Sequence, residues 1–160
     1  RMYDMLFICA ANVGRSQMAE GFYNYYTKGE NAISGAAIPL TEERVADFYK
    51  HRPAKEISEV MKERDIEISG QLIKTVTEEM FQNVEKVIVL EKEEILKESK
   101  DPYTHTVLHY INGHSCVEYH SIEDPCKGKP EERSREDNLI KFRFARDQIE
   151  QIVLDLIEER

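Results

Sequence analysis

Short apolar runs alternate with helix-like segments along the whole chain, and this alternation restricts the fold more than any other feature. The runs expected to form strands are 3–9, 32–35, 86–90 and 116–122. The segments expected to form helices are 17–27, 42–49, one opened by Pro53, a helical turn from Thr77, 91–100 and 138–159. Segment 103–113 is expected to be an irregular insertion or a hairpin. Strands that alternate with helices form parallel sheets covered on both faces. We therefore expect an α/β three-layer sandwich with a four-stranded parallel sheet flanked by helices.

The composition indicates one globular domain over residues 1–160, with 41% hydrophobic and 33% charged residues. No apolar run reaches the roughly 18–20 residues that span a bilayer, so we expect a cytoplasmic protein that has no membrane partner. A net charge of −9 argues against nucleic-acid binding, which requires clustered Lys and Arg. The three cysteines, Cys9, Cys116 and Cys126, have the spacing neither of a disulfide framework nor of a metal site. We expect reduced thiols, no metal and no cofactor.

The loop after the first expected strand has the residues of an oxyanion cradle. Its residues are Cys9, Ala10, Ala11, Asn12, Val13, Gly14, Arg15 and Ser16. Successive backbone N–H groups of such a loop can point at a tetrahedral anion, and the following helix adds the positive end of its dipole. The planar guanidinium of Arg15 can bind two anion oxygens. We expect residues 10–15 to bind phosphate.

The same loop favours a nucleophilic thiolate at Cys9, because positive fields of this kind stabilise ionised thiols. Ser16 can donate its hydroxyl to that thiolate, and it also occupies the expected N-cap of the helix. Asp124 follows the fourth expected strand and precedes Pro125, so it is the best candidate for the acid that protonates a leaving oxygen. The carboxyl ends of parallel strands meet at one edge of the sheet, which would bring Asp124 to the loop.

The stretch FICAANVGRSQMAEG resembles the phosphate-binding loop and first helix of the low-molecular-weight protein tyrosine phosphatases and of the related thioredoxin-coupled arsenate reductases. Four further segments resemble the family in order: Ser34-Gly35, MKERDIEISGQ, KVIVL and Glu123-Asp124-Pro125. The resemblance implies that Cys9 carries a phosphocysteine, that Arg15 binds the phosphate and that Ser16 assists the thiolate. It also implies that Asn12 holds the loop and that Asp124 acts first as acid and then as base.

Two positions in the loop and the pair after Asp-Pro depart from the family pattern. Ala11 stands where the family usually has Gly, and a positive φ there would cost Ala about 1–2 kcal/mol. Gly14 stands where many relatives have a second Cys, so a disulfide within the loop is impossible. Cys126 and Lys127 follow Asp-Pro where the tyrosine phosphatases often have aromatic residues, so the usual phosphotyrosine preference does not carry over.

These residues predict a phosphomonoester hydrolase that acts on a phosphorylated protein or a small aryl phosphate. The first alternative is an arsenate reductase acting on the arsenate or phosphate oxyanion, favoured by RSQMAEG and Gln71. Glu91 and Glu98 stand where that branch has its relay cysteines, so the relay is missing unless Cys116 or Cys126 replaces it. A non-catalytic oxyanion-binding module is supported only by Ala11. A further alternative is a sugar-transport phosphocarrier on a similar fold. Such a carrier needs the Cys but neither the Arg nor the Asp-Pro pair, so both features argue against it.

Two further interpretations concern residues outside the loop. The acidic run 91–98 is expected to be the solvated face of a helix, and Cys116 is expected to pack in the core. Cys126 lies two residues beyond Asp124 and is a candidate to form a disulfide with oxidised Cys9, which requires Cα atoms within about 7 Å.

Overall fold

A computed structural model of the chain describes residues 2–39, 41, 55–126 and 132–160. The four strands are β1 (Tyr3–Cys9), β2 (Ala32–Ala36), β3 (Val84–Val89) and β4 (Val117–Tyr119). They form one parallel sheet in the order β2-β1-β3-β4. The expected four-stranded parallel sheet is confirmed. In its register Ile8 lies beside both Gly35 and Val89, so the carboxyl ends of the three longer strands meet at one edge.

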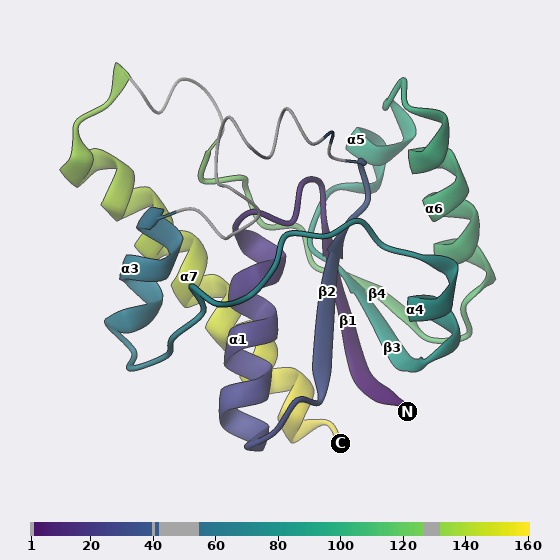
Figure 1. The fold of residues 1–160 in the computed structure, drawn as a ribbon, viewed down its shortest axis with the longest axis horizontal. Helices are drawn as coiled ribbons and strands as arrows, with labels where there is room; N and C mark the ends of the chain where they lie inside the picture. The colour runs from purple at the N-terminus through teal and green to yellow at the C-terminus, as the bar shows by residue number, and fades with distance from the viewer. Residues whose placement is uncertain (1, 40, 42–54, 127–131) are drawn as a thin grey trace.

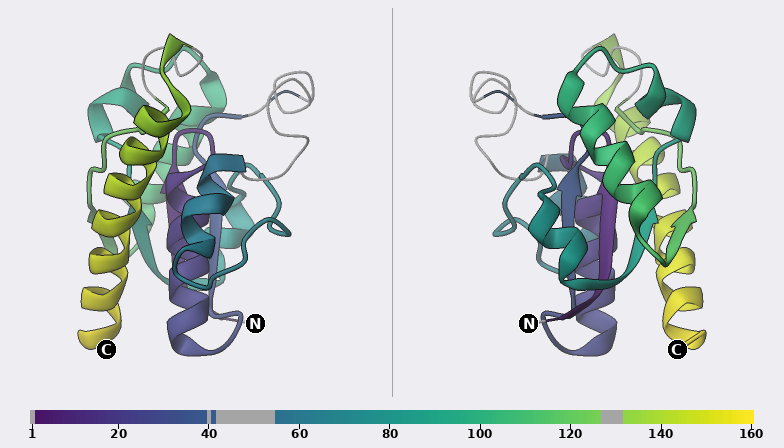
Figure 2. Two further views of the ribbon diagram at one scale, coloured as in Figure 1. Left: turned by 90° about the vertical axis from the view of Figure 1, so that its left-hand side faces the viewer. Right: turned by 90° about the vertical axis from the view of Figure 1, so that its right-hand side faces the viewer.

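Helices cover both faces of the sheet (Figures 1 and 2). One layer contains α1 (Arg15–Thr27), α3 (Lys55–Lys62) and α7 (Arg135–Glu158). The other contains α4 (Glu78–Gln82), α5 (Glu93–Lys97) and α6 (Pro102–Gly113). The two layers lie on the left and on the right of the sheet in Figure 1. The three-layer sandwich is therefore as expected.

Successive side chains of a strand point to opposite faces of the sheet, so the core is divided between the two helix layers. Along β1, Met5 and Phe7 belong to the cluster packed on α1, α3 and α7, whereas Leu6 and Ile8 belong to the cluster on the opposite face. All four side chains are buried, which explains why the first expected strand is a continuous apolar run. No helix among the described residues is long and apolar enough to cross a membrane.

Segment 103–113 is a helix, so the expected irregular insertion or hairpin is wrong. The Asp101 carboxylate accepts a hydrogen bond from the backbone N–H of Tyr103, and Pro102 occupies the first helical turn. Both are signals that begin a helix. Val107 and Ile111 then face the core at helical spacing.

Other boundaries differ by a few residues. Segment 91–100 contains only the short α5, and β4 ends at Tyr119 although the chain continues to hydrogen bond along β3 as far as Ile122. Ser16 is not the N-cap of α1: that residue is Gly14, and Ser16 lies in the first turn. The helix expected at 42–49 and the helix start at Pro53 lie outside the described residues.

Gly35 brings another segment against the edge of the sheet. The backbone of Val76 donates to Ala36, and Ala36 donates to Lys74, so segment 74–76 runs along β2. A Cβ at position 35 would lie 2.6 Å from the Cγ1 atom of Val76 and 3.1 Å from its backbone nitrogen. Only glycine permits this approach, and the approach places Lys74 beside the loop that follows β1.

Candidate active site

The loop between β1 and α1 lies at the carboxyl edge of the sheet, where Cys9 ends β1 and Arg15 begins α1. The residue with positive φ in this loop is Asn12, at 58°, and not Ala11. Asparagine is among the residues that adopt this conformation most readily. Ala11 does not have a positive φ, so the strain expected for alanine in that conformation is absent. Gly14 has a φ of −141°, and a Cβ there would lie 3.2 Å from the Cδ1 atom of Ile57.

Cys9 is buried, and two groups lie within hydrogen-bond distance of its sulfur. The Ser16 hydroxyl oxygen is 2.9 Å from Cys9 Sγ, and the backbone nitrogen of Asn12 is 3.3 Å away. The Asn12 side-chain amide donates to the Ser16 oxygen at 2.7 Å. When Cys9 is ionised, the Ser16 hydroxyl is the donor of this pair, because a thiolate can only accept. Two donors aimed at one sulfur favour its anionic form.

Asn12 is fully buried, and its side chain is held by groups from distant parts of the chain. Its Oδ1 atom accepts from the Lys74 backbone N–H and from the Gln17 amide, both at 3.0 Å. Its amide also donates to the Ser34 hydroxyl at 2.9 Å. Gln71 in turn donates to the Gln17 side-chain oxygen at 2.7 Å. These contacts fix the loop conformation before any anion binds.

Arg15 is buried, and its guanidinium is oriented by two partners. Nη1 donates to the Ile122 carbonyl at 2.8 Å, and Nη2 donates to Glu91 at 2.7 Å. Burial lowers the pKa of Arg15, but the negative charges of Cys9, Glu91 and Asp124 outweigh it and raise that pKa above its ordinary value. Arg15 is therefore a permanent cation at the anion site.

Glu91 is a partner of Arg15 that the sequence did not predict. It is only 6% exposed, so the interpretation of the run 91–98 as a solvated face is wrong at this position. Its second carboxylate oxygen accepts from the Lys92 backbone, which fixes its orientation. The sequence feature that could have indicated Glu91 is its place after β3. A polar residue that follows a buried parallel strand lies at the same edge of the sheet as the loop.

Asp124 also reaches this edge. Its Oδ2 atom is 3.8 Å from Nη2 of Arg15, and its Oδ1 atom accepts from the Cys126 backbone at 2.9 Å. The Asp124 side chain is 45% exposed. A partly exposed carboxyl beside the buried Arg15 can exchange a proton both with a leaving group and with water.

The other two cysteines lie in different surroundings. Cys126 packs against the core cluster that includes Cys9. Cys116 precedes β4 by one residue, and Val117 pairs with Val87, which places Cys116 toward the opposite end of the sheet. Cys116 is displaced from Cys9 by about 13 Å along the strands and about 10 Å across them. That separation exceeds the reach of a disulfide.

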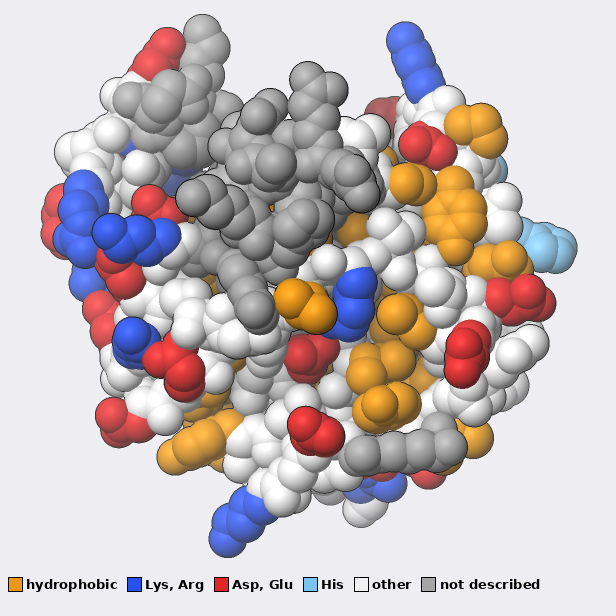
Figure 3. Space-filling view, viewed as in Figure 1, with side chains coloured by type: hydrophobic (Ala, Val, Ile, Leu, Met, Phe, Trp, Pro, Cys, Tyr) orange, Lys and Arg blue, Asp and Glu red, His pale blue; other side chains and the backbone are white. Residues whose placement is uncertain are grey.

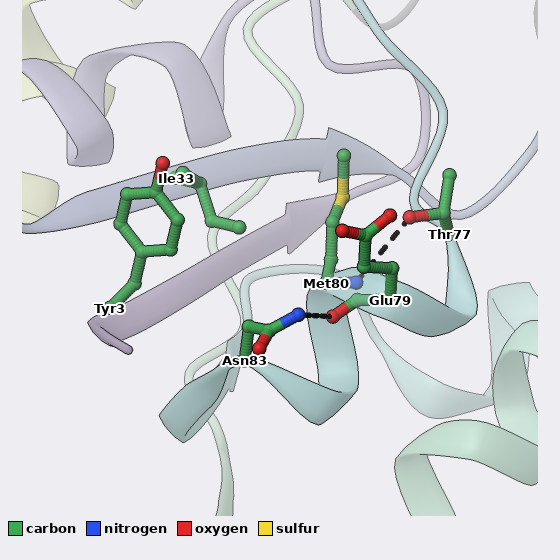
Figure 4. Close-up of a pocket in the computed structure, with 6 residues that line it drawn as sticks. All are labelled: Tyr3, Ile33, Thr77, Glu79, Met80 and Asn83. Carbon is green, nitrogen blue, oxygen red and sulfur yellow. Dashed lines mark hydrogen bonds between the residues drawn. The ribbon is translucent and has the colours of Figure 1, made fainter. Parts of the chain in front are cut away.

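A cavity of about 440 Å³ lies between β1, β2 and α4 (Figure 4). Its lining residues are Tyr3, Ile33, Thr77, Glu79, Met80 and Asn83. None of these residues belongs to the loop: Tyr3 lies roughly 20 Å from Cys9 along β1, and Ile33 pairs with Leu6, roughly 10 Å from Cys9 along the strand. Among the described residues on the face shown in Figure 3, acidic and basic side chains are interspersed and form no extended patch of one sign.

Comparisons with known proteins agree with this geometry. The family model for low molecular weight phosphotyrosine protein phosphatases matches residues 4–159. No match was found among the curated proteins. Many solved structures are similar.

Three of these structures illustrate the range of similarity. The Erwinia amylovora tyrosine phosphatase AmsI has a TM-score of 0.71 at 13% identity, and the match covers 99% of this chain and 93% of that one. A low molecular weight protein tyrosine phosphatase from T. tengcongensis has a TM-score of 0.67 at 21% identity, with 99% of each chain covered. An arsenate reductase in its phosphate-binding state has a TM-score of 0.66 at 26% identity, with 99% of this chain and 98% of that one covered.

Proposed function

Because the chain belongs to the low molecular weight phosphotyrosine protein phosphatase family, we propose that it hydrolyses phosphomonoesters through a phosphocysteine formed on Cys9. The observation that carries this proposal is the convergence of three groups at one edge of the sheet. Two groups lie within hydrogen-bond distance of the Cys9 sulfur, the Arg15 guanidinium is held by Ile122 and Glu91, and Asp124 lies 3.8 Å from Arg15. These are a nucleophile, an anion-binding cation and an acid.

In the first step, the Cys9 thiolate attacks phosphorus and a sulfur–phosphorus bond forms. The bond between phosphorus and the ester oxygen breaks, and that oxygen leaves as an alcohol or phenol with the proton of Asp124. Arg15 and the backbone N–H groups of the loop stabilise the charge on the remaining phosphoryl oxygens.

In the second step, Asp124, now a carboxylate, takes a proton from water as the water oxygen attacks phosphorus. The sulfur–phosphorus bond breaks, and inorganic phosphate and the Cys9 thiolate are released. Ser16 stabilises the departing thiolate, because its hydroxyl lies 2.9 Å from the sulfur and an ionised sulfur can only accept. The substrate class is a phosphorylated protein or a small aryl phosphate.

Arsenate reduction is the second candidate. It is supported by the 26% identity to an arsenate reductase over nearly the whole of both chains. Glu91 opposes it, because the position where a relay cysteine is expected holds a carboxylate bound to Arg15. A reductase of this kind would have to take its second thiol from Cys126 or from an added thiol. A non-catalytic oxyanion-binding role has less support, because nucleophile, cation and acid are all present.

The test is a paired assay on one preparation, measuring aryl phosphate hydrolysis and thiol-dependent arsenate reduction. We expect hydrolysis in the wild type and its loss in Cys9→Ser, because a hydroxyl supplies almost no anionic nucleophile at neutral pH. Circular dichroism establishes that the variant is folded. A folded Cys9→Ser variant that keeps more than a tenth of the hydrolytic rate would refute the proposal. Arsenate reduction without hydrolysis would favour the second candidate.

A further inference from the structure

A carboxylate on α1 is connected to the nucleophile through three side chains. Glu20 accepts a hydrogen bond from the Ser34 hydroxyl at 2.9 Å. The Ser34 oxygen accepts from one N–H of the Asn12 amide at 2.9 Å, and the other N–H of that amide goes to Ser16 at 2.7 Å. Ser16 is 2.9 Å from the sulfur of Cys9. The series Glu20–Ser34–Asn12–Ser16–Cys9 therefore forms one continuous chain of hydrogen bonds, which we call the α1 relay.

With Cys9 ionised, every hydrogen bond in the α1 relay has one direction. The Lys74 backbone N–H can only donate, so the Asn12 atom 3.0 Å from it is the oxygen, and the amide nitrogen faces the two serines. Both amide protons are then used. An ionised Glu20 can only accept, so it holds the Ser34 proton. An ionised Cys9 can likewise only accept, so it holds the Ser16 proton.

Lys74 closes the relay at its far end. Its ammonium lies 3.5 Å from the Glu20 carboxylate and 3.3 Å from the Leu72 carbonyl oxygen. The Glu20 side chain is 12% exposed and that of Lys74 is 32% exposed. The same residue thus orients Glu20 with its side chain and Asn12 with its backbone.

We propose that Glu20 is a positioning residue for the nucleophile, acting through Ser34 and Asn12 on the hydroxyl of Ser16. By accepting the Ser34 proton, Glu20 makes the Ser34 oxygen a stronger acceptor for the Asn12 amide, because hydrogen bonds in a chain polarise one another. The amide then holds Ser16 in the one orientation that donates to Cys9. This role deepens the proposed function and rests on Cys9 being its nucleophile.

A purely electrostatic role for Glu20 predicts the opposite effect. A carboxylate near a thiolate disfavours it, so removing Glu20 should make the Cys9 thiolate easier to form. If Glu20 acts through the relay, removing it should make that thiolate harder to form. Among the described residues, the charged groups facing Cys9 are Arg15 and its partners Glu91 and Asp124, and the one facing Glu20 is Lys74. The variants used in the test leave these four charged side chains in place.

The experiment measures the rate of alkylation of Cys9 by iodoacetamide against pH, following the Cys9 peptide by mass spectrometry. We expect Glu20→Ala to move the midpoint to higher pH by roughly half a unit to one unit, the size expected for the loss of one oriented hydrogen bond. Ser34→Ala should move it in the same direction. The double variant should move it no further than Ser34→Ala alone, because both changes break one chain.

Glu79→Gln is the matched control for net charge, since Glu79 is exposed and lies near the opposite end of β1. Glu20→Gln repeats the test if Glu20→Ala does not fold, and should give a smaller shift in the same direction. A midpoint that stays at the wild-type pH or moves to lower pH, or shifts that add in the double variant, would overturn the proposal.

Alkylation reports the thiolate without any substrate, so this result is separate from the proposed function. Wild-type hydrolysis together with an unmoved midpoint would refute the relay alone. A shifted midpoint in a protein that hydrolyses no phosphomonoester would refute the proposed function and leave the relay standing.

Discussion

Replacing Glu91 tests whether the buried pair with Arg15 holds the anion site together. Both side chains are nearly inaccessible, at 3% and 7% exposure, so solvent screens their interaction little. Glu91→Ala leaves a buried guanidinium without its main counter-charge, and breaking a buried pair in this way costs about 3–5 kcal/mol. Glu91→Gln keeps an acceptor oxygen and loses only the charge. Because a charge-assisted hydrogen bond is roughly twice as strong as a neutral one, we expect a loss of about 1–2 kcal/mol.

Urea denaturation at pH 7, with and without inorganic phosphate, measures both losses. Phosphate supplies a new counter-charge to Arg15, so we expect it to stabilise Glu91→Gln more than the wild type. Glu93→Gln is the control, because Glu93 forms only a surface pair with Lys97, worth about 0.3–0.5 kcal/mol. If Glu91→Ala unfolds at the same urea concentration as Glu93→Gln, the buried pair does not stabilise the site as argued.

Three further predictions concern the acid, the second thiol and the surface. Asp124→Asn should slow hydrolysis by about 10²–10⁴-fold for poor leaving groups and less for p-nitrophenyl phosphate; equal losses would mean that Asp124 only shapes its loop. After peroxide treatment, Cys126 should form a disulfide with Cys9, and Cys126→Ala should recover less activity with dithiothreitol than the wild type does. If peptide mapping finds no such disulfide and both proteins recover equally, Cys126 has no redox role. The Arg143 hydrogen bond lowers the pKa of Glu63 to about 2. The pair between Glu63 and Arg143 should therefore stabilise the fold at pH values above the pKa of Glu63 in the unfolded chain. This contribution should disappear as the pH falls through about 2, where Glu63 becomes protonated in the folded protein. Urea midpoints of Glu63→Gln and wild type should converge at that pH, and a constant difference would contradict the assignment.

The sheet could be predicted because its strands are local features. Residues 5–9 and 87–90 are apolar runs buried on both faces, and burial on both faces removes the polar alternation that marks an exposed strand. The helix α6 was missed for a local reason as well. Asp101-Pro102 can end one helix or begin another, and only the packing of Val107 and Ile111 against the sheet decides between them.

The candidate site also contains a part that is local in sequence and a part that is not. The loop from Cys9 to Arg15 could be placed at the carboxyl edge of the sheet because it is continuous in sequence. The partners that orient them are not: Glu91 is 76 residues from Arg15, and Lys74 is 62 residues from Asn12. Such contacts depend on which strands are neighbours and on their register, and composition and periodicity carry neither. A charged residue directly after a buried strand was the one available signal for Glu91.

The central claim is that Cys9 becomes phosphorylated during turnover, and trapping that species tests it most directly. Asp124→Asn should slow hydrolysis of the intermediate, because the residue that activates water is lost. The variant is mixed with p-nitrophenyl phosphate, quenched in acid within the first turnover and digested, and its peptides are examined by mass spectrometry. The account predicts one phosphoryl group, on the peptide that contains Cys9. A phosphoryl group on any other residue, or a burst of nitrophenol with Cys9 unmodified, would contradict it.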